Sequence, residues 1–463
     1  MKPPKTDNQI YDLIGVGVGP FNLSLASLLA PIESVNSIFF DSQKQFDWHA
    51  GLLMEDCDLQ VPFMADMVTM ADPTSPYSYV NYLHEHGRLY QFYFYDNFQI
   101  PRIDYNLYCR WVSEKLTSVK FSQRVINIEQ DGKVFYVTVK EILNNVETTY
   151  TCRNIVLGTG SSPSWPSSAA HLRTHTSCIH SAQYKFEKNN LQKKKSITII
   201  GSGQSAAEIF LDLLKEENHY GYKLNWLSRS HGFFPMEHSK LGLEHFSPEY
   251  IDHFHSLPEQ QRDNIRSYQN LWYKGISNTT ISEIYNQLYK RSFTQGNCNI
   301  ALQARSQLEH IECVDNKFTL SFQHLDKKEY FNLDTDSVVL ATGYQHLFPD
   351  CLNSLKPLLQ MDTSGRPVIN RNYTMNVSSN IQGKIYVQNA ELHTHGIGAP
   401  DLGLGAYRSA MIINQLLNKE HYTIRRKNVF QQFGIDEHWQ KKSHVEMLSR
   451  KTVESASQRV DVF

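Results

Sequence analysis

Two stretches of the chain share the same order of apolar, small and polar residues. In each one, a short apolar run that predicts a buried strand leads into a glycine-rich turn and then into a helical pattern. The first run covers residues 11–14 with its turn at 15–20, and the second covers residues 196–200 with its turn at 201–205. A strand followed by such a turn brings the N–H groups of a helix N-terminus against a pyrophosphate. Two of these units predict two dinucleotides on one chain, which indicates a flavin that is reduced by a nicotinamide.

A second apolar run follows each predicted helix, and the two runs end differently. Residues 37–40 end at Asp41, where a carboxylate can accept hydrogen bonds from an adenosine ribose. Residues 224–227 end at Arg229, which stands between two serines and without an acid. A basic end with hydroxyl groups suits a 2′-phosphate and favours NADPH over NADH. An ordinary strand-end acid and a surface arginine are the alternative interpretations.

The remaining pattern divides the chain into two sheet-forming domains and a helical segment. Strand patterns recur over residues 119–158 and 297–340, whereas tyrosine, histidine and helical spacing dominate residues 231–292. We therefore predict an α/β protein with two Rossmann-like dinucleotide-binding domains and a helical insertion that contributes to the substrate site. The predicted boundaries are 1–165 and 335–425 for the FAD domain, 166–334 for the NADPH domain that contains the helical region, and 426–463 for a polar C-terminal tail.

Composition and charge narrow the class of protein. A chain of 463 residues with 41% hydrophobic residues is long enough for two or three globular domains. The net charge of −2 gives no reason to expect nucleic acid, and no apolar run approaches the ~18–20 residues of a membrane span. The seven cysteines are scattered and form no CxxC pair, and the N-terminus lacks a signal-peptide core. These features predict a cytoplasmic protein with free thiols and without a metal site.

Several short motifs occur in an order that is specific to one family. In these motifs the chain resembles the flavin-dependent N-hydroxylating monooxygenases of siderophore biosynthesis, which act on lysine, ornithine and related diamines. The resemblance extends over residues 9–418. Its motifs are GVGVGP at 15–20, FDWH at 46–49, LQVPF at 59–63, DPTSPYSYVNYL at 72–83, GSGQS at 201–205, ATGY at 341–344 and HTHG at 393–396.

The resemblance implies a reaction in which the cofactor supplies the reactive oxygen. In the family, NADPH reduces FAD, the reduced flavin takes up O2 as a C4a-hydroperoxide, and the substrate amine attacks the distal oxygen to become a hydroxylamine. No protein nucleophile is needed, so we predict no catalytic side chain. The amine must first lose its proton, since its pKa is about 10.4 in water, and desolvation favours the neutral form. Homo-oligomers, often tetramers, are the implied assembly.

The resemblance also assigns residues to the two cofactors. Core packing is an alternative role for Trp48 among them. The residues matched to FAD are Gly15, Gly17, Gly19, Pro20, Asp41, Trp48, His49 and Gln60. The residues matched to NADPH are Gly201, Gly203, Gln204, Ser205 and Arg229.

Two departures from the family pattern concern the substrate. Family members that hydroxylate free amino acids carry a lysine where this chain has Ala65, and a leucine–serine pair where it has Leu402 and Gly403. The lysine pairs with the substrate carboxylate, and burying that carboxylate without a partner costs several kcal/mol. We therefore expect a decarboxylated substrate beside Gln60, namely putrescine, cadaverine or histamine. Glu244 could pair with the far ammonium, and a solvated acid at a helix end is its alternative interpretation.

Three other functions fit parts of the sequence. L-lysine N6-hydroxylation or L-ornithine N5-hydroxylation is the nearest, if another residue supplies the partner of the substrate carboxylate. A pyridine-nucleotide disulfide reductase also binds two dinucleotides, but it needs a paired-cysteine centre that the sequence lacks. A flavin-binding sensor without turnover is the third, and release of hydroxylamine would separate it from the enzyme.

Overall fold

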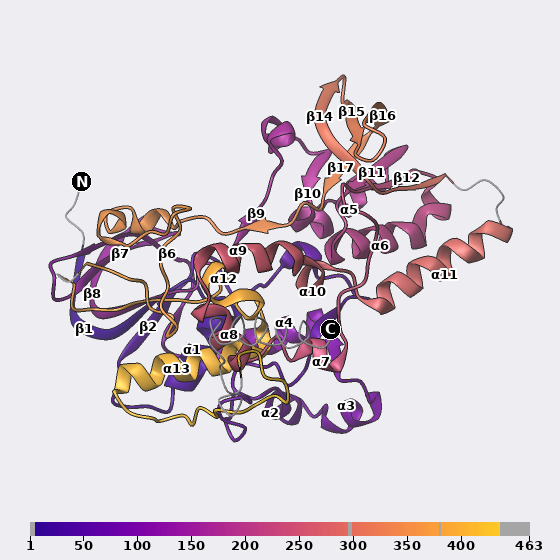
Figure 1. Cartoon of the computed structure of the whole chain (residues 1–463). Helices are drawn as coiled ribbons and strands as arrows, with labels where there is room; N and C mark the ends of the chain where they lie inside the picture. Colours follow the sequence, from indigo (N-terminus) through magenta and orange to yellow (C-terminus); the bar gives the residue numbers. More distant parts are fainter. Residues whose placement is uncertain (1–4, 295–298, 379–380, 436–463) are drawn as a thin grey trace, which may run out of the picture.

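The computed structural model describes residues 5–294, 299–378 and 381–435 (Figure 1). Two largely parallel sheets stand side by side and each carries one of the predicted glycine turns. This confirms the predicted α/β fold with two dinucleotide-binding units. Within these described ranges, no helix is long and apolar enough to cross a membrane.

The first sheet has seven strands in the order β5-β2-β1-β8-β7-β6, and β19 also pairs with β8. The strands β1, β2, β5, β8 and β19 are parallel, whereas β6 and β7 form an antiparallel extension. The β1–turn–α1–β2 unit predicted from the sequence lies at its centre. The strands are β1 (Lys5–Val16), β2 (Ser37–Phe40), β5 (Val119–Lys120), β6 (Gln123–Gln130), β7 (Phe135–Glu141), β8 (Glu147–Leu157) and β19 (Ile385–Val387).

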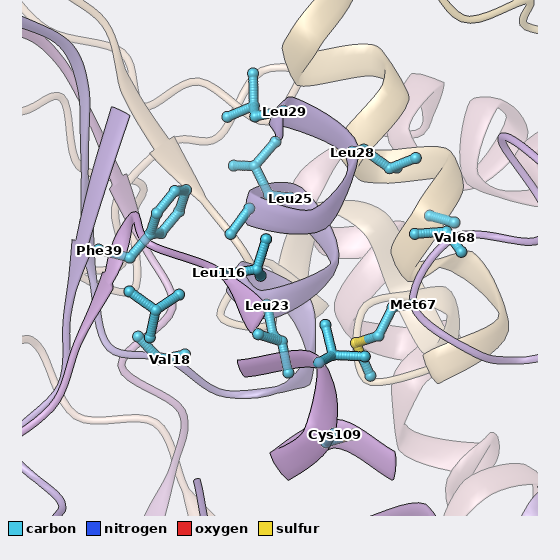
Figure 2. Close-up of a cluster of buried hydrophobic side chains, with 14 of the residues drawn as sticks. Val18, Leu23, Leu25, Leu28, Leu29, Phe39, Met67, Val68, Cys109 and Leu116 are labelled. Carbon is cyan, nitrogen blue, oxygen red and sulfur yellow. The ribbon is translucent and has the colours of Figure 1, made fainter. Parts of the chain in front are cut away.

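Helix α1 (Pro20–Leu29) forms the core behind the first turn. Its ten residues are all buried, because the sheet covers one side while α4 (Arg102–Lys115) and α13 (Gly405–Leu417) cover the others. Figure 2 shows its leucines between Phe39 of β2 and the segment with Met67 and Val68. A helix with apolar residues all around it is stable only in such a position, and its polar Asn22, Ser24 and Ser27 form hydrogen bonds there. The packing therefore fixes the N-terminus of α1 at the end of β1.

The second sheet is parallel throughout, in the order β10-β17-β11-β12-β13. Helix α6 (Gln204–Tyr220) follows its glycine turn and ends at Gly221 in the left-handed conformation. A small antiparallel sheet, β14-β15-β16, continues from β13. The strands are β10 (Cys178–His180), β11 (Ser196–Ile200), β12 (Lys223–Leu227), β13 (Ile300–Gln303), β14 (Ser306–Val314), β15 (Lys317–His324), β16 (Glu329–Thr335) and β17 (Ser337–Leu340).

One predicted boundary is displaced. The sequence pattern places residues 335–425 in the first domain, but β17 pairs with both β10 and β11 in the second sheet. The chain returns to the first unit only after β18 (Tyr344–Gln345), which pairs with β9 (Ser162–Pro163) on the outgoing connection. The sequence of an apolar strand does not indicate which sheet the strand joins, because both sheets bury such strands on two faces.

The predicted helical region at 231–292 contains five helices: α7 (Lys240–Leu243), α8 (Pro248–Ser256), α9 (Glu259–Tyr268), α10 (Asn270–Lys274) and α11 (Asn278–Thr294). Helix α11 packs along α6 of the second unit. Helices α8 and α9 instead contact α12 (Leu392–His395), which belongs to the first unit (Figure 1). The insertion thus joins the nucleotide unit to the glycine-rich loop that follows β19.

The remaining short elements of the first unit surround its helical layer and the connections between the units. They are β3 (Asp58–Pro62), β4 (Gln99–Pro101), α2 (Tyr79–Glu85) and α3 (Leu89–Tyr95). Helix α5 (Tyr184–Leu191) belongs to the second unit, where Tyr184 and Leu191 pack in the core.

Candidate active site

A cavity of about 2000 Å³ lies between the two units, where the carboxyl ends of both parallel sheets face each other. Ligands of open α/β sheets bind at such ends. Most of the residues predicted for the cofactors line this cavity, including residues from both turns. They are Gly17, Gly19, Pro20, Asp41, Trp48, His49, Gln60, Gly201, Gly203, Gln204, Ser205 and Arg229. Leu402, which is predicted for the substrate, also lines the cavity.

The two turns contact the neighbouring strand ends in the same way. Gly17 has φ +84°, and a Cβ atom there would lie 2.5 Å from the carbonyl oxygen of Gly158. Gly201 has φ +146°, and a Cβ atom there would overlap the carbonyl oxygen of Ala341. Both positions therefore require glycine. Gly15 differs, because the ring of Phe39 fills the space of its missing side chain outside the cavity lining.

The start of each helix is open toward the cavity. Gly19 precedes α1, and a Cβ atom there would meet no atom within 4 Å. Gly203 precedes α6, and the nearest atom to such a Cβ would be the carbonyl oxygen of Lys274 at 3.2 Å. Neither helix has a side-chain cap. Their first N–H groups, together with the helix dipoles, form two anion-binding ends of the kind that hold a pyrophosphate.

The ends of the second strands differ, as the sequence predicts. Asp41 accepts hydrogen bonds from the N–H groups of Val18 and Gln43, each at 2.7 Å, so its carboxylate holds the first turn against β2. Arg229 is exposed on the cavity wall at the end of β12. The hydroxyl groups of Ser202 and Ser230 lie 2.7 Å apart beside it. A cation and hydroxyl groups therefore meet next to the second turn.

Trp48 and His49 form an aromatic wall in the middle of the cavity. The backbone N–H of Trp48 donates to Asn106 Oδ1 at 2.8 Å, and the indole ring contacts Tyr105 edge-on. His49 has φ 52°, a left-handed conformation that is uncommon for a side chain of this size. Such strain is typical of functional sites. The ring of Tyr344 lies 5.5 Å from the His49 ring.

His49 and the nearby His180 are both uncharged at neutral pH. His49 keeps surface exposed to the cavity although it lies deep in the protein, and this desolvation, with the cation of Arg102 adding to it, lowers its pKa to about 4. Burial likewise lowers the pKa of His180 to about 4, although its Nε2 lies 3.1 Å from the carbonyl oxygen of Gly343. Its ring lies 5.4 Å from the Tyr344 ring, edge-on. The site thus disfavours positive charge on a buried nitrogen.

Two predicted glutamines, Gln60 and Gln204, differ in how far their side chains are hydrogen-bonded within the protein. Gln60 lines the cavity, and its Nε2 is buried without a hydrogen-bond partner among the described residues. An unpaired buried donor costs about 1–3 kcal/mol, so an acceptor from a bound molecule would stabilise it. Gln204 is already engaged: its amide contacts the Ser277 N–H at 2.7 Å, Glu208 Oε1 at 2.9 Å and Thr280 Oγ1 at 3.0 Å. Its side chain therefore holds the helical insertion against α6.

The residues predicted for the substrate separate into two groups. Ala65 is buried, and a Cβ atom placed on Gly403 would lie 3.9 Å from the Ala65 Cβ, so these two positions are neighbours. Leu402 lies on the cavity wall beside them. Glu244 lies elsewhere, outside the cavity lining, and accepts hydrogen bonds from the N–H groups of Phe430 at 3.0 Å and Gln431 at 2.9 Å. These hydrogen bonds lower the pKa of its carboxyl, and they favour a structural role.

Sequence reasoning missed two polar groups that hold the site together. Asn22 is buried behind the first turn, where its Nδ2 donates to the carbonyl oxygen of Gly17 at 2.7 Å and its Oδ1 accepts from Gln388 at 2.7 Å. Arg102 and Glu208 form a buried ion pair at 2.6 Å between α4 and α6. An asparagine inside an apolar helix was the available signal for the first. No signal in the sequence indicated the Arg102–Glu208 ion pair, since its two residues are far apart in the chain.

Two facing Rossmann-like units around one cavity indicate a flavoprotein that binds two dinucleotides, an architecture that flavin monooxygenases share. The model of the L-lysine 6-monooxygenase/L-ornithine 5-monooxygenase family matches residues 9–346, and the chain belongs to this family. This also confirms the resemblance inferred from its motifs.

Relatives of known name cover nearly the whole chain. A putrescine N-hydroxylase of Shewanella oneidensis is 43% identical over 94% of this chain and 86% of its own length. One of Acinetobacter baumannii is 41% identical over 92% and 94%. The crystal structure of a cadaverine monooxygenase of Erwinia amylovora, from the desferrioxamine pathway and with FAD bound, is similar with a TM-score of 0.89 and 39% identity, and covers 93% of this chain and 100% of that one.

Proposed function

We propose that the protein is an FAD- and NADPH-dependent monooxygenase that hydroxylates one nitrogen of a primary aliphatic diamine, as the first step of siderophore biosynthesis. Putrescine and cadaverine are the expected substrates. The observation that carries the proposal is the pair of neighbouring small residues, Ala65 and Gly403, beside the cavity. A carboxylate bound there would have no lysine at position 65 to pair with. The names of the relatives from Shewanella, Acinetobacter and Erwinia support the same substrate class.

The residues of the cavity fit the two cofactors. FAD would lie with its pyrophosphate at the open start of α1 beside Gly19, and its ring system near the Trp48–His49 wall, where the unpaired Gln60 amide can donate a hydrogen bond. NADPH would lie at Gly203, with its 2′-phosphate near Arg229. When bound, the reduced flavin supplies the activated oxygen derived from O2.

The protein's own contribution is to position the amine and to favour its neutral form. A primary amine has a pKa of about 10.4 in water, so it enters the cavity as a cation without a free lone pair. The desolvation that lowers the pKa values of His49 and His180 to about 4 acts on a bound ammonium in the same direction. The cavity therefore promotes loss of the proton from the nitrogen that is to react.

A substrate panel tests the proposed function. NADPH-driven hydroxylamine formation should be measured with putrescine, cadaverine, histamine, lysine and ornithine. The best diamine should exceed both amino acids in kcat/KM by roughly 100-fold or more, because their carboxylate would be buried without a partner. Lysine or ornithine as the best substrate would contradict the proposal, and peroxide release without hydroxylated product would indicate an uncoupled oxidase.

Removal of the Arg229 side chain should weaken NADPH selectively. We expect Arg229→Ala to raise the KM for NADPH roughly 10- to 100-fold, because a charge-assisted hydrogen bond contributes about 1.5–3 kcal/mol. The KM for NADH, which lacks the 2′-phosphate, should change little. Lys223→Ala is the matched control, since Lys223 is an exposed cation at the opposite end of β12. Equal increases in the KM for NADPH and for NADH would show that Arg229 does not bind the 2′-phosphate.

We extend the proposal to a cytoplasmic homo-oligomer. Family resemblance supports the assembly, and the free cysteines among the described residues support a reducing compartment. Native mass measurement and cell fractionation test these two points separately from the activity.

A further inference from the structure

Asp401 is a deeply placed carboxylate whose hydrogen bonds leave one oxygen free. It precedes the short helix η7 (Leu402–Leu404), and its Oδ1 accepts from the Leu404 N–H at 3.2 Å. In the described part of the chain, nothing donates a hydrogen bond to Oδ2 and no cation forms an ion pair with this residue. The Arg408 guanidinium, whose charge acts on Asp401, is instead paired with Glu391 at 3.0 Å.

An unpaired carboxylate in this position is costly without a ligand. Burial raises the pKa of Asp401 to about 6, although N–H groups of the loop and the charge of Arg408 oppose the shift. The residue also keeps a partly accessible surface, despite lying deep in the protein.

Asp401 lies beside the large cavity, although it is not itself among the residues that line it. Pro400 and Leu402, which flank Asp401 in the chain, both line the cavity together with Gln60. A Cβ atom placed on Gly403 would lie 2.8 Å from Asp401 Oδ1. The same Cβ atom would lie 3.9 Å from the Cβ of Ala65. The carboxylate therefore stands beside both positions at which an amino-acid anchor is missing.

We propose that Asp401 binds the distal ammonium group of the diamine while the other nitrogen reacts. This inference rests on the proposed function and adds the group that selects the substrate. An ammonium would give Oδ2 a charge-assisted hydrogen bond and would neutralise the buried charge. The α-carboxylate of lysine or ornithine would meet a like charge at the same place, so a single side chain would attract diamines and reject amino acids.

The test compares diamines with monoamines of the same carbon number. Putrescine and butylamine differ only in the distal nitrogen, so the wild-type holoenzyme should prefer putrescine. In Asp401→Asn, kcat/KM for putrescine should fall by roughly 30-fold or more, chiefly through KM, whereas the value for butylamine should stay within about threefold. Asparagine has nearly the same shape and keeps the Oδ1 acceptor for the Leu404 N–H, so η7 retains its cap. The thermal shift of the holoenzyme on adding putrescine should decrease in parallel.

Each other outcome identifies which idea fails. A wild-type enzyme that hydroxylates neither putrescine nor cadaverine overturns the proposed function and the pairing with it. A wild-type enzyme that hydroxylates putrescine but does not prefer it to butylamine overturns the pairing alone, and needs no variant. Unchanged putrescine kinetics in Asp401→Asn, or a loss of preference in Glu244→Gln instead, would also assign the ammonium to another partner.

Discussion

Alanine at position 17 is expected to abolish the retention of FAD by the purified protein. The left-handed conformation of Gly17 costs about 1–2 kcal/mol for a residue with a Cβ atom. The added atom would also lie 2.5 Å from the carbonyl oxygen of Gly158, and overpacking of this kind costs about 1–3 kcal/mol more. Relief requires the turn to move away from β8, which displaces the N–H groups at the start of α1. Flavin absorbance per protein after gel filtration measures the result.

Gly87 supplies a control for the backbone strain alone. It has φ +66°, lies beyond the end of α2 outside the cavity lining, and a Cβ atom added there would meet no atom within 4 Å. Gly87→Ala should therefore lower stability modestly and leave the flavin content normal. If Gly17→Ala retained as much flavin as Gly87→Ala, the close approach of the turn to Gly158 would not be what positions the cofactor.

The elements that could be predicted are those in which local pattern and tertiary packing agree. The apolar runs at 196–200 and 37–40 coincide with β11 and β2, and the helices after both turns begin where the glycine pattern ends. In these units the sequence of a few adjacent residues decides the conformation, because a glycine turn between a strand and a helix has few alternatives. Most of the cofactor residues follow from these units.

The residues that could not be predicted depend on contacts between distant segments. Asp401 directly precedes Leu402 and Gly403, yet nothing in the local sequence indicates that its carboxylate lacks a partner. Glu244 has the sequence features of a substrate ligand, but its hydrogen bonds go to residues 430–431, almost two hundred positions later. Spacing along a chain does not reveal which charges meet across it, whereas burial and hydrogen bonding in the folded protein do.

Arg102→Leu is expected to destabilise the protein strongly, by about 3–5 kcal/mol, because it leaves Glu208 as an unpaired buried charge. Arg102 donates to both carboxylate oxygens of Glu208, at 3.0 and 2.6 Å, and to the carbonyl oxygen of Leu52 at 3.0 Å. The same carboxylate orients Gln204 at the start of α6. The free energy of unfolding of the holoenzyme in urea measures the loss.

Two further variants separate burial from charge. Arg153→Leu is the matched control, since Arg153 forms an equally short ion pair with Asp12, 2.5 Å long, but is largely exposed; its loss should cost less than about 1 kcal/mol. Replacing both Arg102 and Glu208 by leucine should recover much of the lost stability, because no unpaired charge remains. If the double variant were as unstable as Arg102→Leu, the penalty would come from lost packing between α4 and α6 rather than from the unpaired charge of Glu208. In that case the ion pair would not be the contact that fixes the position of the two dinucleotide units relative to each other.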